Sequence, residues 1–509
     1  MISVAPGATP DVSGRIKVLM ISSEVAPFAQ TGGLGDVVSG LSLCLARLGC
    51  DVLIVTPRYG VSRAPQPARW WPETVTVRLG WGALDVVSLG VLEARVDAGE
   101  GAAVRICFLD HPNLFGREGI YGDAHGGFGD NDVRFTAMSR GALAVAERLW
   151  PSREGDDRTS GPDIVHAHDW HAALAVVDLA LSRLEESARP RTVLTIHNLA
   201  FQGVYGAEVL DRIALPRAAF DDGTLAHDGQ VNLLRGAIAL ADRVTTVSPT
   251  YAREILGRRE GCGLDAVLRE QRHKLAGILN GIDQSIYDPS TDASLARRYD
   301  RSSALDGRAA CKAELVTETG LQAEGGPIFA SVCRLAEQKG IDLLLSIVPA
   351  LVERGASFIL MGAGDASLEH ALRAMAARFP GRVEARIAFD PTVARRIYAG
   401  ADFFVVPSRY EPCGLTQLYA MRYGAIPVVT AVGGLKDTVT PISAAHEAGT
   451  GFVAANASVV ELLVACEDAI ALYHDRVSHE AAVVRAMSRE SGWSSSAGQY
   501  LALYHSALS

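Results

Sequence analysis

Short apolar runs separated by amphipathic stretches recur along the chain. The first run, IKVLMIS at 16–22, is almost wholly apolar, which is typical of a parallel strand buried on both faces. A glycine-rich turn, TGGLG at 31–35, follows it, and residues 36–48 then show the apolar spacing of a helix. A second run, DVLIVT at 51–56, predicts the next strand. Further strands of this half are predicted at 104–109, 163–167, 192–196 and 243–247.

The same alternation restarts in the second half of the chain. Its predicted strands are 328–333, 357–361, 401–406 and 426–429. Short strands alternating with helices predict a doubly wound α/β sheet. A chain of 509 residues is too long for one ordinary hydrophobic core, and the alternation occurs twice in it. We therefore predict two Rossmann-like domains facing each other across a cleft.

The domain bounds follow from a change in composition. Residues 261–272 contain glycines and many charges, so we place the junction near 275. The predicted parts are a disordered N-terminus at 1–15, an N-terminal domain at 16–275 and a C-terminal domain at 276–486. Residues 487–509 are predicted to form a last amphipathic helix that packs back on the N-terminal domain.

Composition and charge narrow the function. The net charge of −10 argues against nucleic acid and against an anionic membrane surface, because both partners require a basic face. No apolar run reaches the roughly 18–20 residues that span a bilayer, and residues 1–15 lack the basic and apolar regions of a signal peptide. Eight scattered cysteines with no C-x-x-C pair indicate reduced thiols in a cytoplasmic protein.

Two loops of the second half carry the sharpest chemical signal. In SVCRLAEQKGIDL, Arg334 leaves the end of a strand and Lys339 lies just before a helix, an arrangement that suits a diphosphate. On spacing alone, two solvated loop charges explain these residues equally well. In PSRYEPCGLTQLY, Glu411 lies in the loop after a strand, and it is either a site carboxylate or a helix-capping acid. The backbone N–H groups that follow at 414–416 favour phosphate.

Two weaker signals belong to the same half. Cys413 is predicted to be a packed thiol, because no histidine lies near it in the sequence. The loop VGGLKD at 432–437 again follows a strand, but isolated glycine pairs are often only turns.

The first half offers three polar loops at strand ends. TGGLGD at 31–36 resembles a phosphate-binding turn but does not match G-x-G-x-x-G. In HAHDWH at 166–171, alternate histidines on a strand end share a face and do not converge as zinc ligands do, so we predict no metal and a hydrogen-bonding role for His168. In TIHNLAFQG, His197 is by itself more often structural, whereas Asn198 and Gln202 suit a sugar.

Taken together, these segments resemble the bacterial glycogen synthase and plant starch synthase family. The resemblance runs from about residue 16 to the end, and its segments occur in the family's order. They are TGGLGDVV at 31–38, DHPNLF at 110–115, FGDNDVRF at 128–135, HAHDWHA at 166–172, TIHNLAFQG at 195–203, VSPTYAREI at 247–255, ILNGID at 278–283, CRLAEQKGIDL at 333–343, PSRYEPCGLTQLYAMRYG at 407–424 and GGLKDTV at 433–439.

The resemblance implies a GT-B architecture and transfer of glucose from a nucleotide sugar to the non-reducing end of an α-1,4-glucan, with retention. It leans towards ADP-glucose rather than UDP-glucose, and it implies no metal and no cofactor. The donor would bind mainly to the C-terminal domain and the glucan mainly to the N-terminal domain.

The resemblance also implies roles for individual residues. Arg334 and Lys339 would neutralise the diphosphate, Glu411 would support positive charge on the transferred glucose, and His168 would contact that glucose. The other donor-side residues would be Gln30, Gly32, Gly33, Asp36, Asn280, Cys413, Gly414, Leu415 and Thr416. The acceptor-side residues would be Asp130, Asn131, His197, Asn198 and Gln202.

Charge development agrees with these roles. Breaking the glucose–phosphate bond leaves negative charge on the diphosphate and positive charge on the sugar, which fixed cations, backbone N–H groups and one carboxylate stabilise. Two mechanisms of retention remain open: one through a covalent enzyme intermediate, and one through attack on the same face of the sugar. We favour same-face attack, because Glu411 has no obvious carboxylate partner.

One position departs from the family. Where its members commonly have lysine before the TGGL turn, this chain has Gln30, which brings no charge to the donor. Two alternatives therefore stand beside a glycogen or starch synthase. One is another retaining enzyme of this architecture, such as a sucrose or trehalose-phosphate synthase, and the other is a glucan-binding relative without turnover.

Overall fold

The computed structural model describes residues 14–123, 126–151, 161–182, 189–323, 325–443 and 445–509. Contacts within the chain divide it into two compact units. Unit 1 comprises Met1–Thr245, Glu270–Lys274 and Ala497–Ser509, and unit 2 comprises Thr246–Arg269 and Leu275–Ser496. Almost all of the N-terminal segment predicted to be disordered, 1–15, lies outside the described residues.

Unit 1 is built on a sheet in which the neighbours run β14-β10-β9-β1-β2-β6-β5-β3, with β4 paired to β5. The strands β10, β9, β1, β2 and β6 are parallel, as the apolar runs predict, and they are buried on both faces. The antiparallel extension formed by β3, β4 and β5 was not predicted. The strand bounds are β1 Lys17–Ile21, β2 Asp51–Pro57, β3 Ala68–Trp70, β4 Val75–Arg78, β5 Val86–Gly99, β6 Ala102–Asp110, β9 Ile164–His168, β10 Arg191–Ile196 and β14 Arg243–Thr246.

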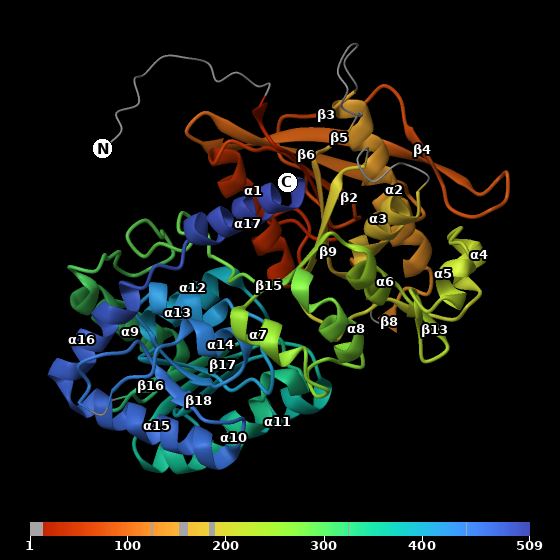
Figure 1. Cartoon of the computed structure of the whole chain (residues 1–509). Helices are drawn as coiled ribbons and strands as arrows, with labels where there is room; N and C mark the ends of the chain where they lie inside the picture. The colour runs from red at the N-terminus through yellow and green to blue at the C-terminus, as the bar shows by residue number, and fades with distance from the viewer. Residues whose placement is uncertain (1–13, 124–125, 152–160, 183–188, 324, 444) are drawn as a thin grey trace. The chain divides into compact units, whose positions relative to one another are not determined.

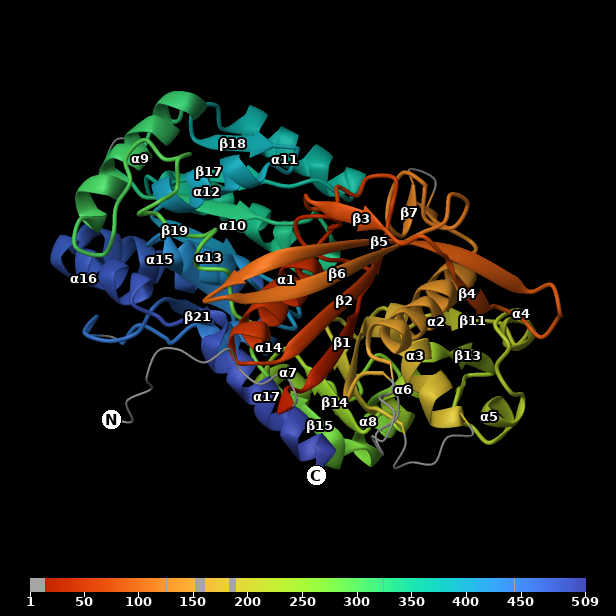
Figure 2. The ribbon, with the colours of Figure 1, turned by 90° about the horizontal axis from the view of Figure 1, so that it is seen from above.

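Helices cover both faces of this sheet (Figures 1 and 2). On one face lie α1 (Gly33–Arg47) and the part of α17 (Trp493–Leu508) that belongs to unit 1. On the other face lie α2 (Asn131–Leu149), α3 (Asp169–Leu181) and α6 (Leu233–Leu240). The last helix begins at Trp493 rather than at 487, because α16 (Arg476–Met487) is a separate helix that ends there.

Unit 2 contains an all-parallel sheet in the order β18-β17-β16-β19-β20-β21. At its centre the rings of Phe329, Phe358 and Phe403 stack within a wholly buried core. Helices α10, α11 and α15 lie on one face, and α9, α12, α13 and α16 on the other (Figure 1). The bounds are β16 Ile328–Val332, β17 Ser357–Met361, β18 Val383–Arg386, β19 Phe403–Val406, β20 Ile426–Thr430, β21 Phe452–Ala454, α9 Ala304–Thr319, α10 Ile341–Glu353, α11 Ala366–Arg378, α12 Pro391–Gly400, α13 Thr416–Arg422, α14 Gly433–Thr438 and α15 Val459–His474.

Several short elements complete the two units. They are β7 Gly122–Asp123, β8 Gly126–Gly127, β11 Val204–Tyr205, β12 Ala226–His227, β13 Gln230–Asn232, β15 Leu275–Gly277, α4 Val209–Arg212, α5 Ala218–Asp221, α7 Pro249–Glu254, α8 Asp265–Glu270, η2 Arg272–Lys274 and η3 Glu337–Lys339. Within the described ranges, no helix is both long and apolar enough to cross a bilayer.

The boundary between the units differs from the predicted junction near 275. Residues Thr246–Arg269 belong to unit 2, because α7 is bound to α14 there. Thr250 donates its backbone N–H and its hydroxyl to the two carboxylate oxygens of Asp437, at 2.7 and 2.6 Å. These partners lie 187 positions apart, so a composition change at 261–272 could not indicate the contact.

Candidate functional site

Two of the predicted site loops meet at the carboxyl edge of the unit 2 sheet. They follow β16 and β19, which are parallel neighbours, so both strands end at the same edge. The loops touch backbone to backbone: a Cβ on Gly340 would lie 2.0 Å from the carbonyl oxygen of Pro407. The N–H of Arg409 also donates to the carbonyl of Gln338 at 2.8 Å. Residues 333–340 and 407–415 therefore form one surface.

Lys339 and Glu411 form an ion pair on this surface. The Nζ of Lys339 lies 2.6 Å from Oε2 of Glu411, and the Ser408 hydroxyl donates to the same oxygen at 2.9 Å. Glu411 is only 6% exposed. It does not cap α13, whose N-cap is Leu415 without a side-chain hydrogen bond, so the interpretation as a capping acid is wrong. Lys339 is more than a solvated loop charge, since it neutralises a buried carboxylate.

Arg334 precedes Lys339 on the same loop, but it is bonded to neither Lys339 nor Glu411. Its side chain is exposed, and no described residue forms an ion pair or hydrogen bond with it. Cys333, between Arg334 and the end of β16, senses all three charges. The pKa of its thiol is raised to about 11, chiefly by burial and to a smaller extent by Glu411, while Lys339 and Arg334 oppose the shift. The charges of Arg334, Lys339 and Glu411 therefore all act on Cys333.

Cys413 is a buried thiol, as predicted. Burial raises its pKa to about 12, outweighing the opposing hydrogen bonds from Asn280, so the thiol stays protonated near neutral pH. Asn280 is itself buried, and its Oδ1 has no hydrogen-bond partner among the described residues. The structure thus brings Asn280, Cys413 and Glu411 together, although 131 positions separate Asn280 from Glu411 in the printed sequence.

The glycine pair of VGGLKD is required by close packing rather than by a turn alone. Gly433 has a φ of +42°, and a Cβ there would lie 2.0 Å from the carbonyl oxygen of Glu411. The N–H of Gly434 donates to that carbonyl at 3.0 Å. On the other side, the N–H of Gly433 is bound by both carboxylate oxygens of Glu254 at 3.1 Å. Glu254 was not predicted as a site residue.

In unit 1, the turn TGGLG is organised by Glu24, another residue that the sequence did not indicate. Its carboxylate accepts the N–H groups of Thr31 and Gly32, at 2.7 and 3.1 Å, and the hydroxyls of Thr31 and Tyr121, at 2.9 and 2.6 Å. Two of the N–H groups that precede α1 are therefore already bound to a carboxylate. The likeness to a phosphate-binding turn does not extend to these groups.

Gln30 is tied to Asp36 at the entrance of the same turn. Its Nε2 donates to Oδ2 of Asp36 at 2.7 Å and to the carbonyl of Gly32 at 3.0 Å. Gln30 is exposed and Asp36 is half-buried. The amide thus occupies the position from which the family's usual lysine would bring a charge.

Four histidines of unit 1 are uncharged near neutral pH: His166, His168 and His171 are buried, and His197 is half-buried. His166 and His168 share one face of β9, as predicted, and their rings stack at 4.3 Å. His168 Nδ1 lies 3.0 Å from His197 Nε2, and its Nε2 is buried without a partner among the described residues. Burial lowers the pKa of His166, His171 and His197 to about 3 and that of His168 well below its ordinary value. In the described ranges, no group of three or more His, Cys, Asp or Glu side chains could hold a metal.

Asp169, directly after His168, holds the neighbouring loop. It has a φ of +56°, a left-handed conformation that costs a non-glycine residue about 1–3 kcal/mol and tends to occur at functional sites. Its Oδ1 accepts the N–H of His197 at 2.7 Å. The pKa of Asp169 is raised to about 7, chiefly by burial and to a smaller extent by the charge of Glu24, against the effect of its backbone hydrogen bonds. This residue lay inside a predicted motif but was not singled out.

Comparison with known proteins decides what these two sets of residues belong to. Residues 17–270 match the family described as Starch synthase catalytic domain, and residues 326–471 match Glycosyl transferases group 1. The chain is 43% identical to a glycogen synthase of Myxococcus xanthus, over 96% of this chain and 99% of that protein. It is 39% identical to glycogen synthase 2 of Geobacter sulfurreducens, over 97% of this chain and 99% of that protein. The chain belongs to the glycogen and starch synthase family.

Solved structures agree with this family. The catalytic domain of starch synthase IV from Arabidopsis thaliana, solved with ADP and acarbose bound, has a TM-score of 0.87 at 30% identity, covering 97% of this chain and all of that one. A sucrose-phosphate synthase from Thermosynechococcus elongatus has a TM-score of 0.58 at 18% identity, covering 97% and 99%. The second likeness concerns the fold alone. The GT-B fold class predicted from the sequence is confirmed.

The residues that the family resemblance assigns to the glucan side are mostly engaged within unit 1. Arg117 holds both oxygens of Asp130 at 2.7 and 2.6 Å. Asn131 donates to the carbonyl of Tyr121 and accepts from Arg134, at 2.9 and 2.6 Å. These bonds fix the start of α2. Gln202 accepts from Asn232 at 2.6 Å, and Asn198 accepts the N–H of Ala200 at 3.1 Å.

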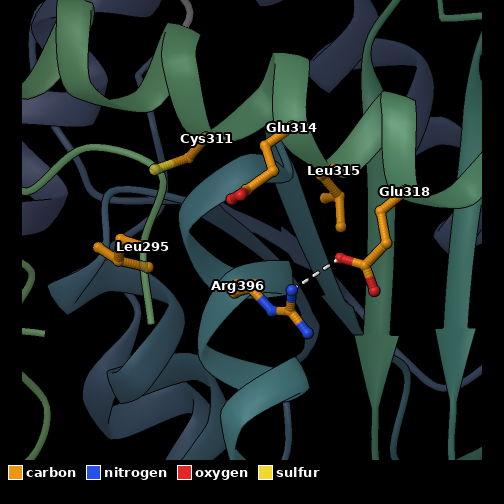
Figure 3. Close-up of a pocket in the computed structure, with 6 residues that line it drawn as sticks. All are labelled: Leu295, Cys311, Glu314, Leu315, Glu318 and Arg396. Atoms are coloured by element: carbon orange, nitrogen blue, oxygen red, sulfur yellow. Dashed lines mark ion pairs between the residues drawn. The ribbon is translucent and has the colours of Figure 1, made fainter. Parts of the chain in front are cut away.

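A small hollow in unit 2, away from these residues, is not a candidate binding site. It lies between α9 and α12 and is lined by Leu295, Cys311, Glu314, Leu315, Glu318 and Arg396 (Figure 3). The ion pair between Arg396 and Glu318, 3.1 Å long, crosses it, and it has no room for the centre of a water molecule. It is a gap in helix packing.

Proposed function

We propose that this chain transfers glucose from ADP-glucose to the non-reducing end of an α-1,4-glucan with retention of configuration. The observation that carries the proposal is the buried carboxylate of Glu411, paired with Lys339 at 2.6 Å, with the unpaired cation of Arg334 on the adjoining loop. A reaction that separates a sugar cation from a diphosphate needs both signs of charge in one place.

Within this proposal each charge has its own task. Lys339 and Arg334 neutralise the leaving diphosphate, and Glu411 stabilises positive charge on the glucose. All described contacts of the Glu411 carboxylate go to Oε2, which leaves Oε1 for a sugar hydroxyl. Buried Asn280, with its unpartnered Oδ1, borders the same sugar, and the buried imidazole of His168 is proposed to contact it through Nε2. Neutral imidazoles suit hydroxyl groups, because they add no charge next to the developing cation.

Same-face attack is the mechanism of retention that the geometry supports. A double displacement needs a nucleophilic carboxylate and a second carboxyl group about 5 Å away. Asp437 is the other carboxylate whose charge reaches Cys413, but both of its oxygens are bound by Thr250. Glu411 is already paired with Lys339. The diphosphate oxygen is therefore the proposed base for the incoming glucan hydroxyl.

The preference for ADP-glucose rests on the relatives. The starch synthase IV structure contains ADP, and the curated relatives are bacterial glycogen synthases. We also propose that the reaction needs no metal and no cofactor and takes place in the cytoplasm. The eight free cysteines fit a reducing compartment.

The deciding experiment measures release of nucleoside diphosphate from ADP-glucose and UDP-glucose, each with and without glycogen and with and without a chelator. We expect glycogen-dependent release from ADP-glucose that survives chelation. Nuclear magnetic resonance of the new linkage reports retention. Release from neither donor, with glycogen binding intact, would instead support a glucan-binding protein without turnover.

A further inference from the structure

Gln417, in the first turn of α13, is a fully buried polar side chain to which neither the motifs nor the proposed chemistry gives a role. Its Nε2 donates to the carbonyl oxygens of Cys413 and Gly414, at 3.2 and 2.8 Å, and contacts the hydroxyl of Thr438 at 3.1 Å. Only the amide nitrogen of a glutamine can donate to carbonyls, so these contacts fix which way the amide faces.

Fixing these two carbonyls fixes the N–H groups on the other side of the same peptide planes. In a trans peptide, the C=O of one residue and the N–H of the next point in opposite directions. The N–H groups of Gly414 and Leu415 therefore point away from the buried amide. No described residue accepts the N–H of Gly414, Leu415 or Thr416, although each is next to the buried Glu411 loop.

The conformation depends on glycine at 414 as well as on the glutamine. Gly414 has a φ of +71°, and a Cβ there would lie 2.5 Å from Oε1 of Gln417. That oxygen is buried and has no partner among the described residues. The loop thus contains a buried acceptor without a partner, and its N–H groups point in one direction. This arrangement is expected at a binding site rather than in a core.

We propose that Gln417 is a positioning residue for the nucleotide-sugar donor: its amide holds the 413–414 and 414–415 peptides so that their N–H groups bind the diphosphate. The inference rests on the proposed function, since it assumes that the donor occupies this loop. Gln417 does not touch the donor. It lowers the cost of binding because the peptides need not reorient when the phosphate arrives.

The test measures ADP affinity by calorimetry and the KM for each substrate in the full-length protein, for wild type, Gln417→Met and Gln417→Asn. Methionine keeps the length and apolar volume but cannot donate, so ADP affinity should fall about 10–100-fold, the range expected when buried hydrogen bonds are lost and their carbonyl acceptors are left unsatisfied. The KM for the donor should rise. Maltooligosaccharide affinity should stay within about twofold of wild type.

Thr438→Val is the matched control, because it removes one contact of the same amide and leaves both carbonyl contacts in place. We expect its ADP affinity to change by less than about threefold. If Gln417→Met does not fold, Gln417→Asn decides, since it keeps the amide but is one methylene too short.

The outcomes separate the inference from the function on which it rests. A folded Gln417 variant with ADP affinity within about twofold of wild type would overturn the inference, as would an equal loss in Thr438→Val. If wild type itself binds neither ADP nor UDP, the proposed function fails and takes the inference with it.

Discussion

The ammonium nitrogen of Lys339 lies 2.6 Å from Oε2 of Glu411, in a pair whose carboxylate is almost wholly buried. Each charge compensates the other while the site holds no ligand. When a diphosphate binds, the same lysine can interact with both anions without leaving the carboxylate uncompensated. The pair is thus a structural contact and a proposed catalytic one at the same time.

Replacing Glu411 with Gln tests the catalytic part. The amide keeps the shape but removes the charge that would stabilise the glucosyl cation. We expect kcat to fall about 10²–10³-fold, the usual effect of losing one preorganised electrostatic group. ADP affinity should be kept or increased, because Lys339 no longer has an anionic partner. Steady-state kinetics and calorimetry give both values.

Ser408→Ala is the control for that variant, since it removes the other contact to Oε2 and leaves the charge in place. Its kcat should fall much less. Equal kcat values for Glu411→Gln and wild type would contradict the assignment of Glu411.

Replacing Gln30 with Lys restores the family's usual residue. Gln30 now donates to Asp36 at 2.7 Å from an exposed position, and a lysine there can reach the same carboxylate or the donor phosphates. We expect the KM for ADP-glucose to fall by up to about tenfold, which corresponds to about 1.4 kcal/mol of added binding. The gain should shrink as salt rises, since the added charge is exposed.

Gln30→Met separates charge from the loss of the Asp36 contact. It should not lower the KM. A Gln30→Lys enzyme whose KM equals that of wild type at low salt would show that this position does not meet the donor.

The buried histidines predict an acid-sensitive fold. His166, His171 and His197 have pKa values lowered to about 3 by burial, against about 6.5 in an unfolded chain. Between those values the unfolded state binds more protons than the folded state. The free energy of unfolding therefore falls as pH drops below 6.5, by up to about 1.4 kcal/mol per pH unit for each histidine. Urea unfolding at pH 7.5, 6 and 5 measures the slope.

Asp169 works in the opposite sense. Burial raises its pKa to about 7, so between about 4 and 7 the folded state holds a proton that the unfolded state has lost, and stability falls as pH rises. Asp169→Asn removes this effect. The free energy of unfolding of the variant, minus that of wild type, should increase by up to about 1.4 kcal/mol per unit from pH 4 to 7. A difference independent of pH would contradict the raised pKa.

The parallel strands could be predicted because they are continuous apolar runs. IKVLMIS and DVLIVT match β1 and β2 within a residue or two. The β3–β5 extension was missed because its strands are not continuous apolar runs. In β4, Val75–Arg78, only every second residue is buried, and four such residues are a weak signal. The loops that follow the parallel strands could be predicted to form a site, because parallel strands end at the same edge of a sheet and bring their following loops together.

The site residues that could not be predicted from the sequence have one physical feature in common. Glu24, Glu254 and Gln417 bind backbone N–H or carbonyl groups, which leave no trace in residue type, and Glu24 also accepts the hydroxyls of Thr31 and Tyr121. Glu254 binds the N–H of a residue 179 positions away, and Glu24 binds a hydroxyl 97 positions away. Such pairs depend on the folded arrangement of strands. Reactive side chains in motifs can be found from the sequence, whereas the groups that hold those motifs cannot.

Tyr504, in the last helix, α17, contacts one of the buried histidines of unit 1. Its hydroxyl lies 2.8 Å from Nδ1 of His166, and both side chains are fully buried. The other ring nitrogen of His166 lies 2.6 Å from the Thr195 hydroxyl. Tyr504→Phe leaves one buried nitrogen unsatisfied, which should lower the free energy of unfolding by about 1–3 kcal/mol. Because His166 stacks on His168, we also expect a loss of kcat, smaller than that of Glu411→Gln.

His505→Gln, at the next position of α17, is the matched control because this side chain is exposed. It should change stability by no more than about 0.5 kcal/mol. Chemical unfolding and steady-state kinetics of both variants give the comparison. If Tyr504→Phe were as stable and as active as His505→Gln, the hydrogen bond to His166 would contribute nothing, and α17 would support unit 1 through its other contacts, such as the hydrogen bond from Arg243 to the carbonyl of Ser506.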